Sequence, residues 1–546
     1  MSDQTSATTR REVLYAGAAV AALAATGTAT AQTPPKKARW RRMNVTDPAA
    51  AKMVESYKKA VRAMLKLPPS DPRNWYRHAL VHTIDCPHGN WWFPIWHRGY
   101  IGWFEQVCRD LSGDPDFALV YWDWTALPEI PAVMFEDVLN PSDPAYIATL
   151  DEFRKQLNPE IDKMWAKFSQ AQIGQLLNRG LRFPADLNFD IAYPGGPMFF
   201  PQAQARGIKA DKPHLDVPTS KAVSLSTLLD ALGPRDYLTF GSPKTFFHSG
   251  LTGFGVMEGQ PHNKVHNNTG GIITTYQDGK PTTVDLGGFM QSNLSPVDPL
   301  FFLHHANIDR IWDLWTRKQQ AKGYPIYPEG ADYNQWISEP FLFFTGVDGK
   351  PVAGQTAGAY QTIGQFDYDY QPGSGEEIVP RAPILNATAP SRAVAIAATP
   401  PSRPGVGHKV VLPRANLLSA GKGDGPKFFA KVTVVLPPHH NETVGVAINA
   451  PDGATSVDPN SPQFAASLSM FGHHILHGPV TFTVPLSQPL AALASKKLLS
   501  ADAPVDIKVL PIGGSGGGML GAAPHGDHGA TTPLAASVVA VTVEAH

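Results

Sequence analysis

The sequence predicts a mainly α-helical domain followed, after a linker, by a smaller antiparallel β domain. Through the first part of the chain, apolar residues recur at steps of three and four, as on one face of a helix. From Lys427 onward the pattern changes to short alternating runs rich in β-branched residues, which are typical of a β-sandwich or barrel. The 546 residues are enough for two domains that each bury a core.

Composition narrows the classes of function. The net charge is −1, so neither nucleic acid nor an anionic membrane surface is an implied partner. The chain has 51 prolines and 48 glycines, which favours long loops and a β-rich part over a simple helical protein. It has two cysteines, Cys86 and Cys108, so it is not a disulfide scaffold, although these two could pair in an oxidising compartment.

The N-terminus has the pattern of an export signal. Arg10 and Arg11 precede an alanine-rich apolar run that ends at Ala29-Thr30-Ala31. This predicts a twin-arginine signal peptide over residues 1–31, and hence a bacterial protein that is periplasmic or secreted. The run is too short and too rich in alanine for a membrane span, so none is expected in the mature form.

The helical domain is expected to cover residues 40–372. Its first helix is marked by apolar residues at helical spacing: Val54, Tyr57, Val61 and Leu65. Pro68-Pro69 ends this helix. A second helix is predicted near Trp75 to Ile84, and a third begins near Pro94.

Histidines gather in two parts of this domain. The first group is His82, His88 and His97, among tryptophans and phenylalanines; the second is His262, His266, His304 and His305. Buried imidazoles in apolar surroundings need partners, and clustered neutral imidazoles most often bind a metal. Two metals with three nitrogen ligands each are therefore predicted, and zinc, copper, iron and nickel all suit such ligands. Spacing alone does not choose His82 over His78, or His305 over His304.

Two longer motifs carry a resemblance to a known family. The stretch from His88 to Glu105, with F-P-I-W-H-R, resembles the first copper-binding signature of the tyrosinase family, and D-P-L-F-F-L-H-H-A-N-I-D resembles the second. The resemblance implies two copper ions between the helices of a four-helix bundle, with O2 as co-substrate. It also implies the ligands: His82, His88 and His97 for the first copper, and His262, His266 and His305 for the second.

The same resemblance implies roles for other residues. Cys86 precedes His88 in a Cys-x-His arrangement like that of relatives with a cysteine–histidine thioether, and we favour this thioether over a disulfide. Glu258 and Asn263 match the glutamate and asparagine that hold a water and help to deprotonate a phenol. Some relatives place a phenylalanine over the second copper, thirteen residues before its third ligand, where this chain has Ser292.

The end of the chain resembles plant polyphenol oxidases. Tyr368-Asp369-Tyr370 matches the Tyr-x-Tyr marker that closes their core domain and meets an arginine, here Arg41 or Arg42. Residues 373–426, rich in Pro, Gly, Ala and Ser, are expected to form a linker. Residues 427–546 are expected to form a β domain that covers the copper site of a latent enzyme, with Phe471 as the candidate plug.

The sequence thus predicts an exported tyrosinase that hydroxylates monophenols and oxidises o-diphenols to o-quinones, the precursors of melanin. One alternative is a catechol oxidase or o-aminophenol oxidase without activity on monophenols. Another is an O2 carrier like the units of molluscan haemocyanin. The expected partners are small phenols, O2 and a copper chaperone, and the sequence leaves the oligomeric state open.

Overall fold

The computed structural model describes residues 38–192, 205–379, 394–397, 407–412, 427–436, 444–471, 478–499, 504–512 and 536–546. The expected signal peptide, residues 1–31, lies outside these residues, as does most of the expected linker. Within the described part of the chain, no helix is both long and apolar enough to cross a membrane.

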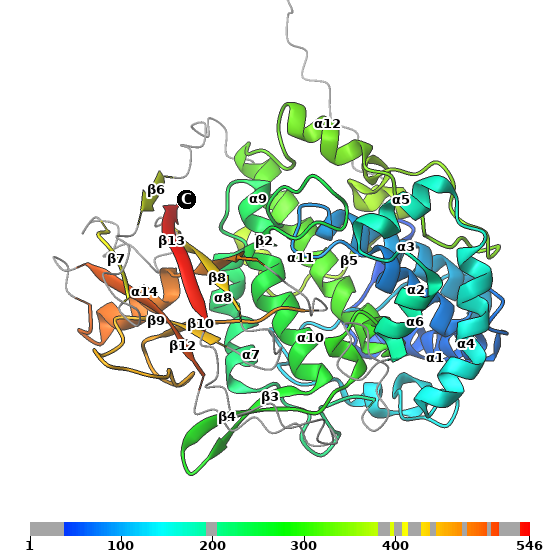
Figure 1. Cartoon of the computed structure of the whole chain (residues 1–546), viewed down its shortest axis with the longest axis horizontal. Coiled ribbons are helices and arrows are strands. Elements are labelled where there is room, and N and C mark those ends of the chain that lie inside the picture. Colours follow the sequence, from blue (N-terminus) through cyan, green and yellow to red (C-terminus); the bar gives the residue numbers. More distant parts are fainter. Residues whose placement is uncertain are drawn as a thin grey trace, which may run out of the picture. The chain divides into compact units, whose positions relative to one another are not determined.

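Helices dominate the part of the chain before residue 380, as predicted (Figure 1). They are α1 (Ala51–Lys66), α2 (Trp75–Asp85), α3 (Phe93–Ser112), α4 (Leu150–Trp165), α5 (Gln170–Asn178), α6 (Pro184–Ala192), α7 (Val217–Ala222), α8 (Leu225–Ala231), α9 (Tyr237–Phe240), α10 (Asn263–Gly270), α11 (Leu300–Lys322) and α12 (Ala331–Ser338). A hairpin of β3 (Ile272–Gln277) and β4 (Lys280–Asp285) follows α10.

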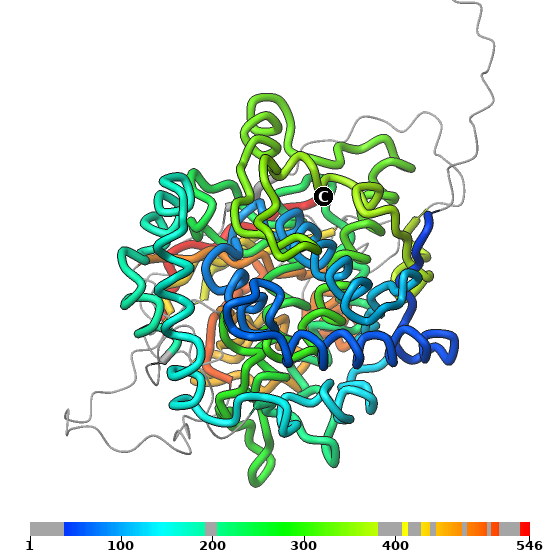
Figure 2. Tube along the Cα trace, turned by 90° about the vertical axis from the view of Figure 1, so that its right-hand side faces the viewer, coloured from blue at the N-terminus to red at the C-terminus, as the bar shows by residue number. Residues whose placement is uncertain are grey.

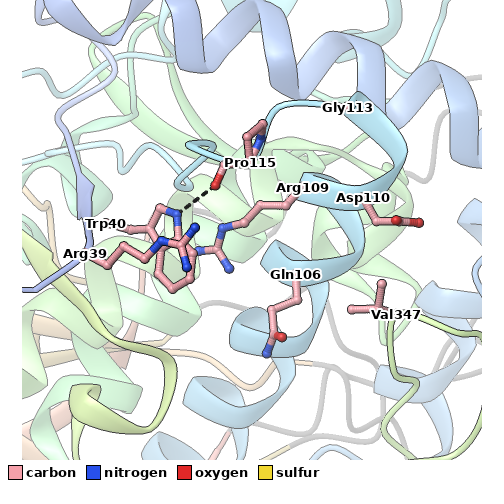
Figure 3. A pocket seen from close by; sticks show the side chains of 8 residues that line it. All are labelled: Arg39, Trp40, Gln106, Arg109, Asp110, Gly113, Pro115 and Val347. Carbon is pink, nitrogen blue, oxygen red and sulfur yellow. Dashed lines mark hydrogen bonds between the residues drawn. The ribbon is translucent and has the colours of Figure 1, made fainter.

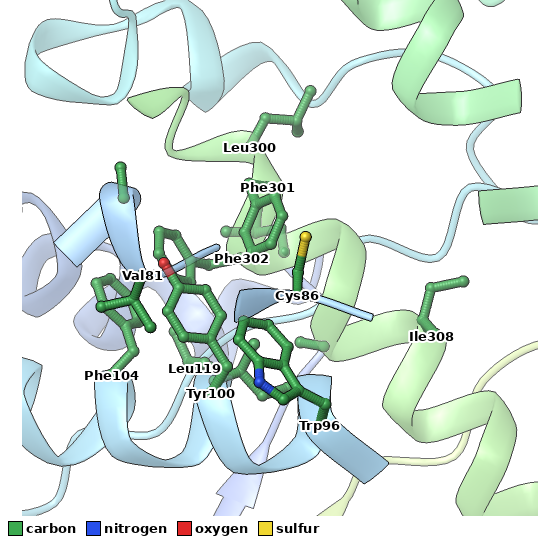
Figure 4. Close-up of a cluster of buried hydrophobic side chains, with 14 of the residues drawn as sticks. Val81, Cys86, Trp96, Tyr100, Phe104, Leu119, Leu300, Phe301, Phe302 and Ile308 are labelled. Atoms are coloured by element: carbon green, nitrogen blue, oxygen red, sulfur yellow. The ribbon is translucent and has the colours of Figure 1, made fainter. Parts of the chain in front are cut away.

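Local signals fix the ends of the helices that matter most for the site. The Asn74 side chain accepts the N–H groups of Tyr76 and Arg77 and so caps the start of α2. Gly113 ends α3 with a φ of 69°, a left-handed conformation that glycine adopts without strain. Aromatic rings pack between α2, α3 and α11 (Figure 4), and the rings of Phe104 and Phe302 stack with centroids 3.5 Å apart.

A buried cluster of charges ties the two ends of the helical part together. Strand β1 (Trp40–Arg42) pairs with β5 (Tyr368–Tyr370) in parallel. The Arg42 guanidinium donates to Glu105 at 2.8 Å, to Tyr370 at 2.8 Å and to Asp309 at 3.2 Å, and it lies 3.6 Å from the centre of the Tyr368 ring. Arg42 is therefore the arginine that meets the Tyr-x-Tyr marker, whereas Arg41 forms an exposed pair with Asp369.

The C-terminal part contains two sheets, in agreement with the predicted sandwich. One sheet has the order β10-β9-β12-β7 and the other the order β2-β11-β8-β13-β6, and one cluster of buried side chains draws residues from both. The strands are β2 (Gly253–Phe254), β6 (Val394–Ala397), β7 (His408–Val410), β8 (Phe428–Val435), β9 (Val444–Ile448), β10 (Phe464–Leu468), β11 (Val480–Pro485), β12 (Val505–Pro511) and β13 (Ser537–Ala545). The pairings are antiparallel except that β2 lies parallel to β11.

Three strands of the two sheets come from outside residues 427–546. Strands β6 and β7 lie inside residues 373–426, the range expected to form a linker, and they are edge strands of the two sheets, where β6 pairs with β13 and β7 pairs with β12. Strand β2 comes from the helical part of the chain and extends the five-stranded sheet. The green helices α7, α8 and α10 lie between the blue helices α1–α3 and the orange and red strands (Figures 1 and 2).

The charge cluster gives a stability prediction. Replacing Arg42 with Met should lower the free energy of unfolding by about 3–5 kcal/mol, because Glu105 and Asp309 would be left buried without this cation. The matched control is Arg41→Met, which breaks an exposed pair and should cost less than about 1 kcal/mol. Chemical denaturation of both variants tests this, and equal losses would contradict it.

Candidate metal centre

The first group of histidines comes together as the motifs predict. His82 lies near the end of α2, His97 lies in the first turns of α3, and His88 lies in the loop between them. The centroids of the His82 and His88 rings are 5.2 Å apart, and the His97 ring lies 5.3 Å from His88 and 5.6 Å from His82. All three side chains are buried.

The second group comes from three segments. His262 ends a π-helical turn (Glu258–His262), His266 lies on α10, and His305 lies on α11. Their ring centroids are 4.6–5.2 Å apart. The two groups adjoin, because the His97 and His305 rings stack at 4.3 Å.

Hydrogen bonds at Nδ1 fix the orientation of four of these six rings. The Nδ1 atoms of His82, His97 and His266 lie 2.7–2.8 Å from backbone carbonyl oxygens of Asn293, Phe93 and Met290, respectively. The Nδ1 atom of His262 lies 2.9 Å from the Asn263 Oδ1 atom. Since a carbonyl oxygen only accepts, each Nδ1 must carry the proton, which leaves the Nε2 lone pair for a metal. Backbone acceptors have no side-chain signature, so the sequence did not reveal the three carbonyl partners.

The Nε2 atoms have the surroundings of metal ligands. Those of His97 and His262 have no hydrogen-bond partner among the described residues. Those of His266 and His305 are 3.0 Å apart, a separation that suits two nitrogens sharing one ion at about 2.0 Å. Burial lowers the pKa of His97 to about 3 and, together with neighbouring imidazoles, holds the pKa values of His262, His266 and His305 well below their usual range. Neutral, buried, converging imidazoles fit a pair of copper ions.

The two alternative histidines occupy different surroundings. His304 is fully buried, with its ring 4.7 Å from that of His266 and 5.3 Å from that of His262, so it adjoins the second group. His78 packs against Tyr100 and Phe104 instead. The structure therefore separates His82 from His78 by position, whereas both His304 and His305 lie within reach of the second group.

Cys86 lies beside His88. Its Sγ atom is 3.3 Å from the His88 Nδ1 atom, and neither Cys86 nor Cys108 forms a disulfide. The disulfide alternative is therefore not the arrangement in this structure. The distance brings the sulfur to the edge of the ring to which a thioether would attach.

Glu258 and Asn263 are buried beside the histidines but differ in their contacts. The Glu258 carboxylate accepts the Gly89 backbone N–H at 2.7 Å and the Ser242 hydroxyl. Asn263 orients His262 and donates its amide to the Ser469 carbonyl at 3.3 Å. Pro261 lies inside the π-helical turn that contains Glu258, so an ordinary α-helical turn does not form there.

Ser292 shapes a turn. Its hydroxyl donates to the Phe289 carbonyl and accepts the Leu294 N–H. The carbonyl groups that hold His266 and His82 lie on either side of it, at Met290 and Asn293. This turn holds one histidine of each group in place.

Three phenylalanine rings surround the imidazoles. Phe93 lies 4.6 Å from His262 and Phe301 lies 4.1 Å from His305, measured between ring centroids. The third ring is Phe471, from the C-terminal part, whose centroid is 4.0 Å from that of His266 and 5.0 Å from that of His88. Phe471 is completely buried, so it occupies space between rings of both groups.

Polar side chains of α10 hold the segment that carries this ring. Lys264 donates from Nζ to the Ser469 hydroxyl at 2.7 Å. The Asn267 amide donates to the same hydroxyl at 3.1 Å and to the Met470 carbonyl at 2.8 Å. Residues Ser469–Phe471, hereafter the plug segment, are thus bound to the helix that carries His266.

A surface pocket of about 490 Å³ lies elsewhere, around Trp40 (Figure 3). The Trp40 ring lies between the guanidinium groups of Arg39 and Arg109, at 4.4 and 3.7 Å. Arg109 lies about 18 Å along α3 from His97, at 1.5 Å per residue. This pocket is therefore separate from the imidazoles.

His248 is buried behind the first group. Its Nε2 atom lies 3.2 Å from Asp85 Oδ1, and its Nδ1 atom lies 3.3 Å from Glu339 Oε1. Burial lowers the pKa of His248, but these two carboxylates outweigh burial and raise it to about 9. The sequence marks His248 and His214 as structural or surface histidines; His248 is structural, and the His214 side chain is 74% exposed.

Comparisons with known proteins point to one family. Residues 57–318 match the family model described as the common central domain of tyrosinase. The chain is 26% identical to a chloroplastic polyphenol oxidase of Spinacia oleracea over 342 residues, which cover 58% of this chain and 45% of that enzyme. It is 24% identical to a tyrosinase of Hahella sp. (strain CCB-MM4) over 333 residues, 54% of this chain and 56% of that protein. The matches thus span only about half the length of these relatives.

A solved structure shares the fold. A recombinantly expressed latent aurone synthase (polyphenol oxidase) superposes with a TM-score of 0.53 at 19% identity, over 94% of this chain and 90% of that one. The superposition includes the C-terminal sheets as well as the helices, since it covers nearly the whole chain.

The ion pairs of His248 predict a pH-dependent stability. Because its pKa is raised from 6.5 to about 9, the charged form stabilises the fold below pH 6.5, and this stability is lost as the pH rises through 9. When the pH is raised from 6.5 to 9.5, the free energy of unfolding should fall by about 3 kcal/mol more in the natural protein than in His248→Gln. Denaturation at both pH values tests this, with His214→Gln as the control; parallel losses in all three proteins would contradict it.

Proposed function

This chain belongs to the tyrosinase family through its central domain, and from that premise we propose that it is a copper enzyme that uses O2 to oxidise phenols. The observation that carries the proposal is the convergence of two adjoining groups of buried, neutral imidazoles at positions matching both copper-binding motifs.

In this proposal each group holds one copper ion. His82, His88 and His97 bind the first, and His262, His266 and His305 bind the second. Copper changes oxidation state, unlike zinc, and the pair would supply the electron transfer between the phenol and O2. The carbonyl groups that accept the Nδ1 protons keep the rings aimed at the ions. A thioether between Cys86 and His88 would fix the orientation of the His88 ring by a covalent bond.

Glu258 is the proposed base for monophenols. A phenol has a pKa near 10, so losing its proton requires a strong base or metal binding. Burial raises the pKa of Glu258 well above its usual range, which makes its carboxylate a better acceptor for that proton. Asn263 keeps His262 oriented and would gain a free amide donor when Ser469 leaves. These two residues support hydroxylation of monophenols in addition to oxidation of o-diphenols.

The C-terminal part is proposed to keep the enzyme latent. The Phe471 ring occupies the space between the imidazoles that a phenol would need. Substrate access therefore requires the plug segment to move or be removed. The site is proposed to be open at Ser292, because this position has no bulky side chain.

Export and partners are further parts of the proposal. The twin-arginine pattern supports export of a folded, copper-loaded protein to the periplasm or the medium. Small phenols and O2 are the proposed substrates, and a copper chaperone is the proposed source of the metal.

Two other functions remain as outcomes of the tests. A catechol oxidase or o-aminophenol oxidase would share the imidazoles and oxidise only o-substituted phenols. An O2 carrier would bind O2 reversibly, with the site permanently covered.

The first test uses the full-length, copper-loaded chain. It should hold two copper ions and oxidise 4-methylcatechol slowly, and Phe471→Gly should raise kcat/KM at least tenfold because the ring no longer fills the site. The matched control is Phe246→Gly, which should leave the rate unchanged because Phe246 is 83% exposed. Reversible O2 binding without turnover in Phe471→Gly would establish the carrier instead.

A second test concerns the base. In the Phe471→Gly background, Glu258→Gln should lower kcat for tyramine by about 10²-fold or more, and kcat for dopamine by less than tenfold. Copper content measured on the same samples separates a lost base from a lost metal. Equal losses on both substrates at full copper content would contradict the assignment, and absence of tyramine turnover before the substitution would favour the catechol oxidase.

A further inference from the structure

Lys264 has an unusual environment for a buried lysine. It is 3% exposed, and among the described residues its hydrogen-bond partner is the Ser469 hydroxyl. The acidic group whose charge acts on it is Asp216, but the Asp216 carboxylate already accepts the backbone N–H groups of Thr219 and Thr274. Buried lysines are rarely left without a carboxylate. A neutral hydroxyl is thus a weak match for this amine.

The amide of Asn267 points to the same place. It shares the Ser469 hydroxyl with Lys264 and also donates to the Met470 carbonyl. The side chains of Lys264 and Asn267, three residues apart on α10, therefore converge on oxygen atoms of the plug segment. Each offers only donors to that segment, which makes the site complementary to a group rich in acceptors.

The plug segment places an aromatic ring and these oxygen atoms at a fixed separation. The Phe471 ring lies over His266, and Ser469 precedes it by two residues, which span at most about 7 Å between Cα atoms. A phenol with a short side chain ending in an oxygen-bearing group has similar dimensions. The segment thus fills both a ring position among the imidazoles and an acceptor position on α10.

We propose that Lys264 and Asn267 bind the carboxylate of a phenolic acid substrate at the place that the plug segment now covers. This rests on the proposed function, which it deepens by naming the substrate class: phenols and o-diphenols with a short side chain that ends in a carboxylate.

The donor chemistry selects this class over neutral phenols. A carboxylate presents two acceptor oxygens and a charge opposite to that of the ammonium, and such charge-assisted bonds are about twice as strong as neutral ones. An alkyl side chain in the same place would leave the amine and the amide without acceptors, which is unfavourable for buried polar groups. Lys264 would therefore act on substrate choice and take no part in the chemical step.

The test compares two substrates that differ only at the end of the side chain. The full-length, copper-loaded chain carrying Ser469→Gly and Phe471→Gly has both the ring and the hydroxyl of the plug segment removed. In this background, kcat/KM is measured for 3-(3,4-dihydroxyphenyl)propanoate and for 4-propylcatechol. Adding Lys264→Met should lower the ratio of the two values, acid over neutral, by about tenfold or more.

Two further variants sharpen the result. Lys264→Arg keeps the charge and should retain most of the ratio, whereas Lys280→Met removes an exposed lysine of the β3–β4 hairpin and should leave the ratio unchanged. A ratio that stays within twofold in Lys264→Met overturns the inference. If 4-propylcatechol is not oxidised even in the parent background, the proposed function fails instead.

A binding measurement keeps the inference testable without turnover. 3-Phenylpropanoate carries the acid but no phenol, and its binding to the same background protein can be followed by calorimetry. Its dissociation constant should rise about tenfold or more in Lys264→Met, and an unchanged constant, or no binding to the parent, overturns the inference. Copper content and thermal unfolding, measured on each variant, identify any protein that has lost its fold.

Discussion

The structure of the site depends on which groups accept hydrogen bonds from the Nδ1 atoms of its buried imidazoles. Each Nδ1 proton needs an acceptor, since an unpaired buried donor costs about 1–3 kcal/mol. Two acceptors, the carbonyl groups of Met290 and Asn293, belong to one turn and hold His266 of one group and His82 of the other. A single short turn thus sets the orientation of rings on α2 and α10 together, and a shift of this turn would disturb both groups at once.

The charge cluster acts on the same helices. Asp309 on α11 pairs with Arg98 on α3 at 2.6 Å. Arg98 comes one residue after His97, and Asp309 comes four residues after His305. Arg42 joins both helices through Glu105 and Asp309. Buried ion pairs of this kind contribute less to net stability than to a unique arrangement, because breaking one leaves an uncompensated charge. Here the arrangement that they specify is the close stacking of His97 on His305.

The sequence predicted those parts of the site that side chains mark at regular spacing. The helices of His82, His97 and His305 follow from apolar periodicity and from the two motifs. Three kinds of feature could not be predicted in this way. Backbone acceptors such as the Met290 carbonyl have no side-chain signature. The π-helical turn before His262 depends on how the chain accommodates Pro261. The contact of Lys264 with Ser469 joins positions 205 residues apart, and only the docked sheets bring them together.

The polar character of α10 would allow the plug segment to leave, as the proposed latency requires. An apolar surface under this segment would gain about 25 cal/mol for each Å² buried and would be unfavourable when exposed to water. Asn263, Lys264 and Asn267 instead meet the segment through hydrogen bonds, each worth about 0.5–1.5 kcal/mol net because water replaces them when the contact opens. Such a surface is stable both covered and exposed, so in the proposed latent state the energy that keeps the site closed would come mainly from Phe471 and the packed sheets. In the proposed mechanism the same donors would serve two states in turn, the segment in one and a substrate's acceptor atoms in the other, and neither state would leave buried polar groups unpaired.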